Sequence, residues 1–555
     1  MTIPARMLAL LVVTLPLSLA ANGPSPEENA AAETIKAEAL LGTVRFLSDD
    51  LLEGRSPGTA GDRLAQKYLA TELEKLGFLP GAPDGTYFQP FDVVSVRSKT
   101  TGVTLSKGRD TVTLKPWADV VAFAGTEEAV ATLAGNEVVF VGYGIVAPEF
   151  RWDDYKGTDL RGKVLLFMNN DPEDDPALFA GKTRLYYGRW DYKFEMAAKK
   201  GAAGAILIHT TPSAAYPWQV VQTSWSGENF SLPSDGTPDV PVKMWFTEAA
   251  SRDLAKLAGK DLDALVAAAK RRDFRPVPFG VALSVELRNE VRRTKTANVL
   301  GTLPGSDPVL SRETVLYTAH HDHLGRNDDA KPGEDAIYNG ALDNASGCAT
   351  VLSVARAMTG LPGRPKRSVT VAFVAGEERG LLGSLYLAKH LPVPSGRVAA
   401  HINVDGANVW GRTRDIGQIG MGKSSLDATI REIAAWQGRT VAPDAFPDHG
   451  TFYRSDQFAF AQIGIPAAYL DAGTDVIGRP AGWGREKRLE FEEKHYHQPS
   501  DELSSDWNTE GWVEDARLLF WLGVRVANGA ARPEWNRGDE FEGARKKALA
   551  ELSPR

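Results

Sequence analysis

The sequence has a single cysteine, Cys348, among its 555 residues. One thiol cannot form a disulfide within the chain, and it cannot build a cysteine-based zinc site. Long basic runs are also missing, and 63 basic against 71 acidic residues give a net charge of −8. This balance argues against nucleic acid or an anionic membrane surface as the main partner. Any bound metal must therefore be held by histidine, aspartate and glutamate.

The N-terminal segment has the composition of an export signal. Arg6 precedes an apolar run at residues 7–17, and Ser18-Leu19-Ala20 then form a small-residue cleavage site. The apolar run is shorter than the roughly 20 residues that a spanning helix needs. We therefore expect a signal peptide over residues 1–20, a mature chain without a membrane span, and a periplasmic or secreted location. An uncleaved anchor is the alternative.

Length and composition predict a soluble protein of more than one domain. A chain of 555 residues exceeds one ordinary core, and 43% apolar with 24% charged residues are typical of globular proteins. Residues 33–79 carry apolar side chains at three- and four-residue spacing, which predicts helices. Between residues 118 and 281 the pattern changes to short apolar runs such as 138–144 and 163–168. No cluster of metal ligands stands out in that stretch, so we expect it to serve substrate access or packing.

From residue 281 onward, apolar strands alternate with helical segments. The expected strands are 315–317, 368–374, 398–404 and 467–470, and the expected helices are 345–358, 381–390, 425–436 and 509–527. Alternation at these lengths predicts an α/β fold with a mainly parallel sheet covered by helices. Folds of this kind place their chemistry beyond the carboxyl ends of the strands.

Ionisable side chains follow several of these strands. The strand expected at 315–317 runs into His320-His321-Asp322-His323, and the next loop leads to Asp343 at the start of a helix. The five candidate metal ligands are His320, Asp343, Glu378, Asp405 and His497. Two imidazoles and three carboxylates are too many for one tetrahedral zinc with an open position. They suit two Zn²⁺ ions about 3.5–4 Å apart that share a carboxylate. The sequence leaves the shared carboxylate open, although Asp343 lies among small residues that allow close backbone approach.

Glu377 and Glu378 are neighbours after the strand expected at 368–374. Adjacent residues of an extended chain point in opposite directions, so one can bind metal while the other faces the open position. A carboxylate placed there can act as general base on water whose pKa a metal has lowered to about 7. Asp322 lies two residues from His320, where a carboxylate can orient the imidazole.

The other histidines receive different interpretations. His321 and His323 crowd the first motif and are expected to be loop residues. His401 is expected in the core, and His449 is a candidate for the lining of a substrate pocket.

Five segments, in order along the chain, resemble the motifs of the di-zinc exopeptidases of metallopeptidase family 28. They are TAHHDHLG, GALDNASG, AGEERGLLGS, INVDGAN and YHQPSDE. DLRGKVLLF and KFEMAAKKGAAGAILIH resemble a protease-associated domain, a β-rich insert found in several peptidases. The resemblance implies a phosphorylase/hydrolase-like α/β zinc-peptidase domain with an inserted protease-associated domain. The implied segments are 22–117 and 282–530 for the peptidase, 118–281 for the insert, and 531–555 for a charged tail.

Carried over by position, the resemblance also implies a role for each site residue. Glu377 becomes the general base, Asp322 the partner of His320, and the peptide bond after Asp343 is expected to be cis. The implied reaction is attack on a peptide bond by a hydroxide held between two zinc ions. The metal-binding roles are His320 and Asp405 for one zinc, Glu378 and His497 for the second, and Asp343 as the bridge.

The leading interpretation is an exported zinc aminopeptidase that removes N-terminal residues from peptides. A carboxypeptidase or dipeptidase of the same family is the alternative, because a carboxypeptidase needs arginines for the terminal carboxylate. Intact ligands together with Glu377 argue against a receptor-like relative without catalysis, and the His/Asp spacing excludes a metallo-β-lactamase. Peptides are the expected partners, and the oligomeric state is left open. Arginines near the candidate loops are Arg412, Arg414, Arg454 and Arg479.

Overall fold

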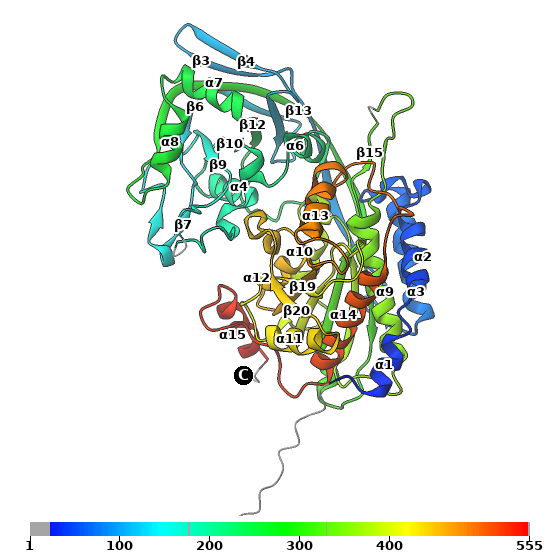
Figure 1. Ribbon diagram of the computed structural model, residues 1–555. Helices are drawn as coiled ribbons and strands as arrows, with labels where there is room; N and C mark the ends of the chain where they lie inside the picture. The colour runs from blue at the N-terminus through cyan, green and yellow to red at the C-terminus, as the bar shows by residue number, and fades with distance from the viewer. Residues whose placement is uncertain (1–22, 176–177, 329, 553–555) are drawn as a thin grey trace, which may run out of the picture.

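The computed structural model describes residues 23–175, 178–328 and 330–552. The predicted signal peptide at residues 1–20 lies outside them. Two lobes are stacked in Figure 1: a lower lobe with a sheet between layers of helices, and an upper lobe drawn in cyan and green. Among the described helices, none combines the length and the apolar character that crossing a bilayer requires.

The lower sheet is built around parallel strands. β17, β14, β18 and β21 pair in parallel in that order, while β13 and β19 flank them in antiparallel orientation. β17 coincides with the strand expected at 368–374. The predicted α/β class with a mainly parallel central sheet is therefore confirmed. In spatial order the strands are β2 (Phe88–Lys99), β13 (Val277–Leu303), β17 (Ser368–Val374), β14 (Thr314–His320), β18 (Val398–Asn403), β21 (Ala467–Asp471), β19 (Asp415–Ile419) and β20 (Thr440–Pro443).

Both faces of this sheet are covered because side chains along each strand alternate between them. On β14, Val315 and Tyr317 pack into one apolar core, and Leu316 packs into another on the opposite face. The first face carries α1 (Pro26–Ala32), α2 (Ala37–Leu47), α3 (Ala60–Lys75), α9 (Ser346–Thr359), α11 (Leu426–Trp436) and α14 (Glu510–Asn528). The second carries α10 (Leu382–Lys389) and α12 (Gln457–Gln462).

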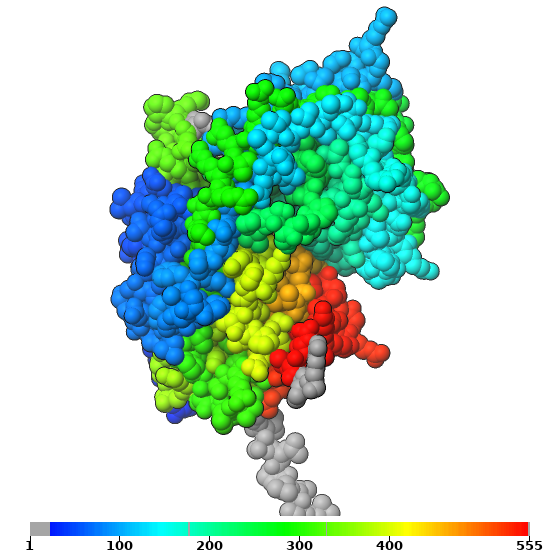
Figure 2. All heavy atoms as spheres, turned by 180° about the vertical axis from the view of Figure 1, so that it is seen from behind, coloured from blue at the N-terminus to red at the C-terminus, as the bar shows by residue number. Residues whose placement is uncertain are grey.

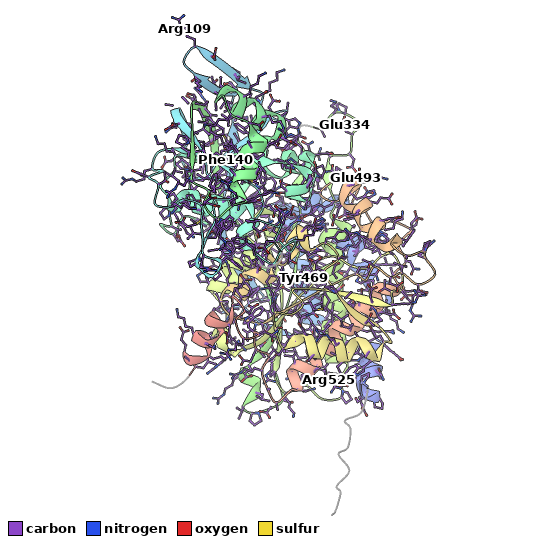
Figure 3. The ribbon with its side chains drawn as sticks, turned by 60° about the vertical axis from the view of Figure 1, so that its left-hand side comes forward. Arg109, Phe140, Glu334, Tyr469, Glu493 and Arg525 are labelled. Atoms are coloured by element: carbon purple, nitrogen blue, oxygen red, sulfur yellow. The ribbon has the colours of Figure 1, made fainter. Side chains whose placement is uncertain are left out.

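The upper lobe has a separate apolar core. The hairpin of β3 (Val103–Lys107) and β4 (Asp110–Leu114) packs into it, although the predicted boundary at residue 118 leaves the hairpin outside the insert. In Figure 3, Arg109 at the hairpin tip points away from the molecule, whereas Phe140 lies inside the lobe. The main elements are β5 (Val120–Ala124), β6 (Val130–Phe140), β9 (Val164–Met168), β10 (Gly204–His209), β12 (Val242–Thr247), α4 (Trp190–Lys199), α6 (Trp218–Trp225), α7 (Glu248–Leu257) and α8 (Leu262–Ala269).

One strand belongs to both lobes. β13 is 27 residues long, whereas strands in globular proteins usually have about 3–10 residues. Its first part pairs with β6 and β3 of the upper lobe, and its last part pairs with β17 of the lower sheet. β2 pairs along it from Arg288 to Val299. Seen from behind in Figure 2, the upper lobe rests directly on the lower one.

Candidate metal centre

The five predicted ligands meet beyond the carboxyl ends of neighbouring parallel strands. His320 is the last residue of β14, Glu378 follows β17, and Asp405 follows β18. Asp343 comes from the turn before α9, and His497 comes from the loop after α13 (Trp483–Lys494). Five segments far apart in the sequence thus deliver their side chains to one place, where open α/β sheets carry their chemistry.

Asp343 lies between the two imidazoles. Its Oδ1 is 3.2 Å from Nε2 of His320, and its Oδ2 is 3.5 Å from Nε2 of His497. On one side, Oδ1 of Asp405 is 3.3 Å from Nε2 of His320; on the other, Oε2 of Glu378 is 2.9 Å from Nε2 of His497. Zinc bonds of 2.0–2.2 Å in a tetrahedron put neighbouring ligand atoms about 3.3–3.5 Å apart. Three of the four separations are close to that value, and the one between Glu378 and His497 is shorter, at 2.9 Å. The Asp343 carboxylate faces both imidazoles.

Several buried polar atoms at the site have no hydrogen-bond partner among the described residues. They are both ring nitrogens of His497, both ring nitrogens of His323, and Oε1 of Glu378. Buried polar atoms are normally hydrogen-bonded. Here they approach one another at 2.5–2.9 Å without hydrogen-bond geometry. Imidazole nitrogens and carboxylate oxygens arranged in this way fit cations placed between them, and the donor set suits zinc.

His323 was expected to be a loop residue, yet it lies at the centre of the site. Its Nδ1 is 2.5 Å from Oε1 of Glu378, and the two residues form a possible metal-binding group with Asp343. His321 points the opposite way, with its Nε2 3.0 Å from Oδ1 of Asp62 on α3. Nothing in the local sequence separates these two histidines, because both follow the same strand.

Glu377 and Asp322 lie beside the ligands. Burial raises the pKa of Glu377 well above its ordinary value, and the carboxylates of Asp405 and Glu378 act in the same direction. The Asp322 carboxylate is 3.8 Å from Nδ1 of His320, which instead lies 3.2 Å from the Asp322 main-chain oxygen. That carboxylate accepts a hydrogen bond from the main-chain N–H of Glu377 at 3.1 Å. Asp322 therefore orients the Glu377 loop more closely than it orients the imidazole.

One buried arginine joins two of the ligand loops. The Arg55 guanidinium donates hydrogen bonds to the main-chain oxygens of His321 (2.8 Å), Asn339 (2.6 Å) and Gly340 (3.0 Å). It also contacts the main-chain oxygen of Leu47 at the end of α2. The loop after β14 and the turn that carries Asp343 are thus fixed relative to each other. Sequence analysis missed this residue, which lies in a Gly-Arg-Ser-Pro-Gly turn.

Asp343 is held by two further side chains. The Asn344 amide oxygen accepts a hydrogen bond from the main-chain N–H of Gly406 at 2.9 Å, which ties the turn to the loop after β18. The Asp501 carboxylate accepts hydrogen bonds from the main-chain N–H groups of Leu342 (2.9 Å) and Asp343 (3.0 Å). The Asp343–Asn344 peptide bond is cis, as the family resemblance implies.

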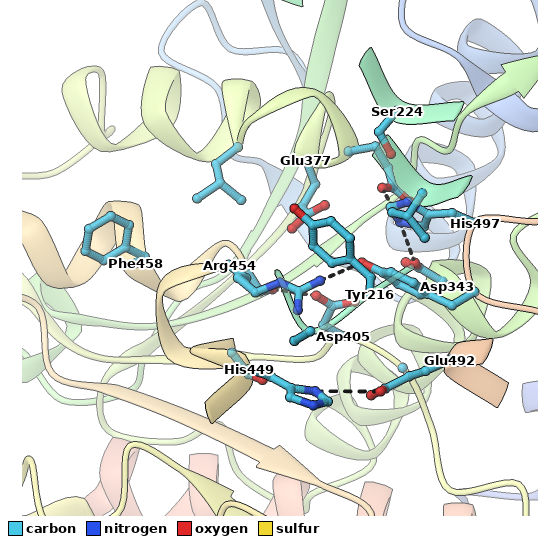
Figure 4. A pocket seen from close by; sticks show the side chains of 18 of the residues that line it. Tyr216, Ser224, Asp343, Glu377, Asp405, His449, Arg454, Phe458, Glu492 and His497 are labelled. Carbon is cyan, nitrogen blue, oxygen red and sulfur yellow. Dashed lines mark hydrogen bonds and ion pairs between the residues drawn. The ribbon is translucent and has the colours of Figure 1, made fainter. Parts of the chain in front are cut away.

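A cavity of about 400 Å³ opens over these ligands. Figure 4 shows Glu377, Asp405 and Asp343 on its floor. His449 lines it as predicted, with Nδ1 3.6 Å from Oε2 of Glu492. The upper lobe supplies part of the wall, which is compatible with the substrate-access role that the sequence left open beside packing. Lining residues from the upper lobe include Arg189, Trp190, Tyr216, Ser224 and Trp225.

Tyr496 also lines the cavity and was not singled out from the sequence. Its ring stacks on the His497 ring with centroids 3.9 Å apart. Its hydroxyl oxygen accepts a hydrogen bond from Nη2 of Arg454 at 3.3 Å. The hydroxyl proton is therefore free to be donated into the cavity.

Part of the chain is similar to a known protein family. Residues 298–520 match the family model described as Peptidase family M28. The chain is 26% identical over 214 residues to leupeptin-inactivating enzyme 1 of Streptomyces exfoliatus, covering 38% of this chain and 43% of that protein. It is 26% identical over 268 residues to leucine aminopeptidase 2 of Trichophyton equinum, covering 45% of this chain and 47% of that protein.

These alignments span less than half of the length of either curated relative. The solved structure of an aminopeptidase from Aneurinibacillus sp. strain AM-1 aligns with a TM-score of 0.52 and 19% identity. That alignment covers 90% of this chain and 96% of the other, and it shows a shared fold. The matched segment contains every predicted ligand, from His320 to His497. Residues 298–520, about two fifths of the chain, are therefore the part that is similar to peptidase family M28.

Proposed function

We propose that this protein is an exported zinc aminopeptidase that removes N-terminal residues from peptides. The observation that carries the proposal is Asp343, whose two carboxylate oxygens face one imidazole each. We assign one Zn²⁺ to His320, Asp343 and Asp405, and a second to Asp343, Glu378 and His497. Export rests on the composition of residues 1–20. We also propose that the upper lobe is a protease-associated insert and that the insert includes the β3–β4 hairpin.

When bound, zinc supplies Lewis-acid polarisation of a peptide carbonyl and activation of water. The residues of the chain perform the remaining tasks. Glu377, at the cavity floor, takes the proton from water and passes it to the leaving amine. Tyr496 donates its hydroxyl proton toward the carbonyl oxygen as negative charge develops there. Asp191, Glu195 and Glu492 also line the cavity, and their charges favour a substrate with a free ammonium group.

A carboxypeptidase is the second candidate, and Arg454 is the observation that favours it. Of the four arginines named from sequence, Arg454 lines the cavity. The others have partners elsewhere. Arg412 donates a hydrogen bond to Glu514, Arg414 donates one to Asp475, and Arg479 lies over the Trp483 ring.

The deciding experiment offers free-amine and N-acetylated forms of the same short peptides to zinc-loaded protein of measured metal content. Cleavage confined to the free-amine forms supports an aminopeptidase, and protein treated with a chelator serves as the control. Equal cleavage of both forms would overturn that assignment in favour of the second candidate. Two bound zinc ions without any cleavage would point to a receptor-like relative.

A further inference from the structure

Three arginine side chains gather at the wall of the cavity. Arg189 comes from the upper lobe and Arg454 from the lower, and both line the cavity. Arg184, also from the upper lobe, is 4% exposed, and Arg189 is 8% exposed. Burial lowers the pKa of Arg184 to about 10; the Asp171 carboxylate opposes this shift, whereas the charges of Arg189 and Arg454 add to it. The three cations are therefore close enough to repel one another.

These cations have few partners. Among the described residues, Nε and Nη2 of Arg184 have no hydrogen-bond acceptor. Nε of Arg189 has none either. Arg189 has an ion-pair partner, because its Nε lies 3.6 Å from Oδ1 of Asp191. Arg454 makes one hydrogen bond, to the Tyr496 hydroxyl, and its guanidinium lies 5.6 Å from the Tyr216 ring centroid. Arg55, by contrast, satisfies a fully buried guanidinium with main-chain oxygens.

Three acidic residues of the same cavity each have a polar partner of their own. Glu195 accepts a hydrogen bond from the Tyr186 hydroxyl at 2.5 Å, Glu492 lies by His449, and Asp471 pairs with Arg488. A buried cation without a partner is costly. Among the described residues, the cavity wall therefore still holds buried N–H donors without an acceptor, at Nε and Nη2 of Arg184 and at Nε of Arg189.

Two further hydrogen-bond donors belong to this wall. The hydroxyl of Tyr216 and Oγ of Ser224 are buried without a partner among the described residues, and both residues line the cavity (Figure 4). Guanidinium groups with nearby hydroxyls are the donors that bind carboxylates most strongly, often through two parallel hydrogen bonds.

We infer that this wall is a subsite for a carboxylate of the peptide substrate, bound by Arg189 and Arg454 with Tyr216 and Ser224 as additional donors. The inference rests on the proposed peptidase function and narrows its substrate class. A cavity of about 400 Å³ lies at the low end of small-molecule pockets, so the carboxylate must be close to the scissile bond. It belongs either to the C-terminus of a dipeptide or tripeptide, or to an aspartate or glutamate side chain.

Three dipeptides with the same free amine separate these sources. Leu-Gln carries a terminal carboxylate, Leu-Glu-amide carries a side-chain carboxylate, and Leu-Gln-amide carries neither. We expect kcat/KM for one of the acidic peptides to exceed that for Leu-Gln-amide at least tenfold, mainly through KM. Arg189→Met should lower kcat/KM for the preferred acidic peptide about tenfold more than it lowers kcat/KM for Leu-Gln-amide. Arg189→Lys keeps the positive charge and should retain part of the preference for the acidic peptide.

The control is Arg275→Met, which removes an exposed arginine of the upper lobe outside the cavity lining. Calorimetric binding of the same peptides to zinc-loaded Glu377→Gln gives a readout that needs no turnover. If the parent enzyme cleaves none of the peptides, the proposed function fails. The calorimetric affinities still show whether the wall binds a carboxylate. Equal affinity and rates for all three peptides, or a preference that survives Arg189→Met, would overturn the inference.

Discussion

Replacing Arg55 by methionine tests whether one buried guanidinium sets the geometry of the metal centre. The change removes donors from four main-chain oxygens, those of Leu47, His321, Asn339 and Gly340. Each buried acceptor left unpaired costs about 1–3 kcal/mol. Water entering the space recovers part of this, so we expect the free energy of unfolding to fall by about 3–5 kcal/mol.

The more specific expectation concerns the metal. Loss of a residue that orients ligand loops lowers metal affinity about 10–100-fold. Zinc affinity is measured by competition with a chelator, and stability by denaturant unfolding of metal-free protein. The matched control is Arg367→Met, because Arg367 is equally buried and bonds Glu313 and Val526 at the opposite end of β17. If both variants lose similar stability but bind zinc like the parent, Arg55 has no positioning role.

Three further changes probe single side chains. Glu377→Gln should keep its zinc and lose turnover by about 10²-fold or more, and loss of metal instead would exchange the roles of Glu377 and Glu378. His323→Gln should weaken zinc binding about 10–100-fold in the chelator assay, whereas unchanged affinity would leave His323 a packing residue. Burial lowers the pKa of His401 to about 3, from 6.5 in the unfolded chain. Above pH 6.5 this residue has no effect on stability, because it is neutral in both states. As the pH falls toward 3, the unfolded chain binds a proton that the folded chain cannot, which costs about 1.4 kcal/mol per pH unit. Denaturant unfolding at pH 6.5, 5.5 and 4.5 should show that the free energy of unfolding falls less steeply with pH for His401→Gln than for the parent. Equal slopes would refute the lowered pKa of His401.

The lower lobe was predictable because its local patterns agree with its tertiary structure. β17 is buried at every position and polar only at Ser368 and Thr370, so the strand expected at 368–374 has its observed bounds. α9 and α11 each begin one residue after the expected start. His320, Glu378 and Asp405 follow strand ends, and parallel strands bring such positions to one edge.

The residues that sequence reasoning missed act through contacts between distant segments. Arg55 lies 266 residues from His321, and its role depends on how the N-terminal helices dock beside α9. His321 and His323 both flank Asp322 but point to opposite sides after β14. Arg189 reaches the cavity because the upper lobe packs over the metal centre. No local periodicity encodes any of these contacts.

The 27-residue strand β13 has a consequence for substrate entry. Because its backbone is hydrogen-bonded into the sheets of both lobes, a hinge cannot open between them without breaking ladder hydrogen bonds. Arg189 and the metal ligands are therefore kept at a nearly constant separation. On the proposed function, the cavity would then admit peptides according to their length and would not need to close around them.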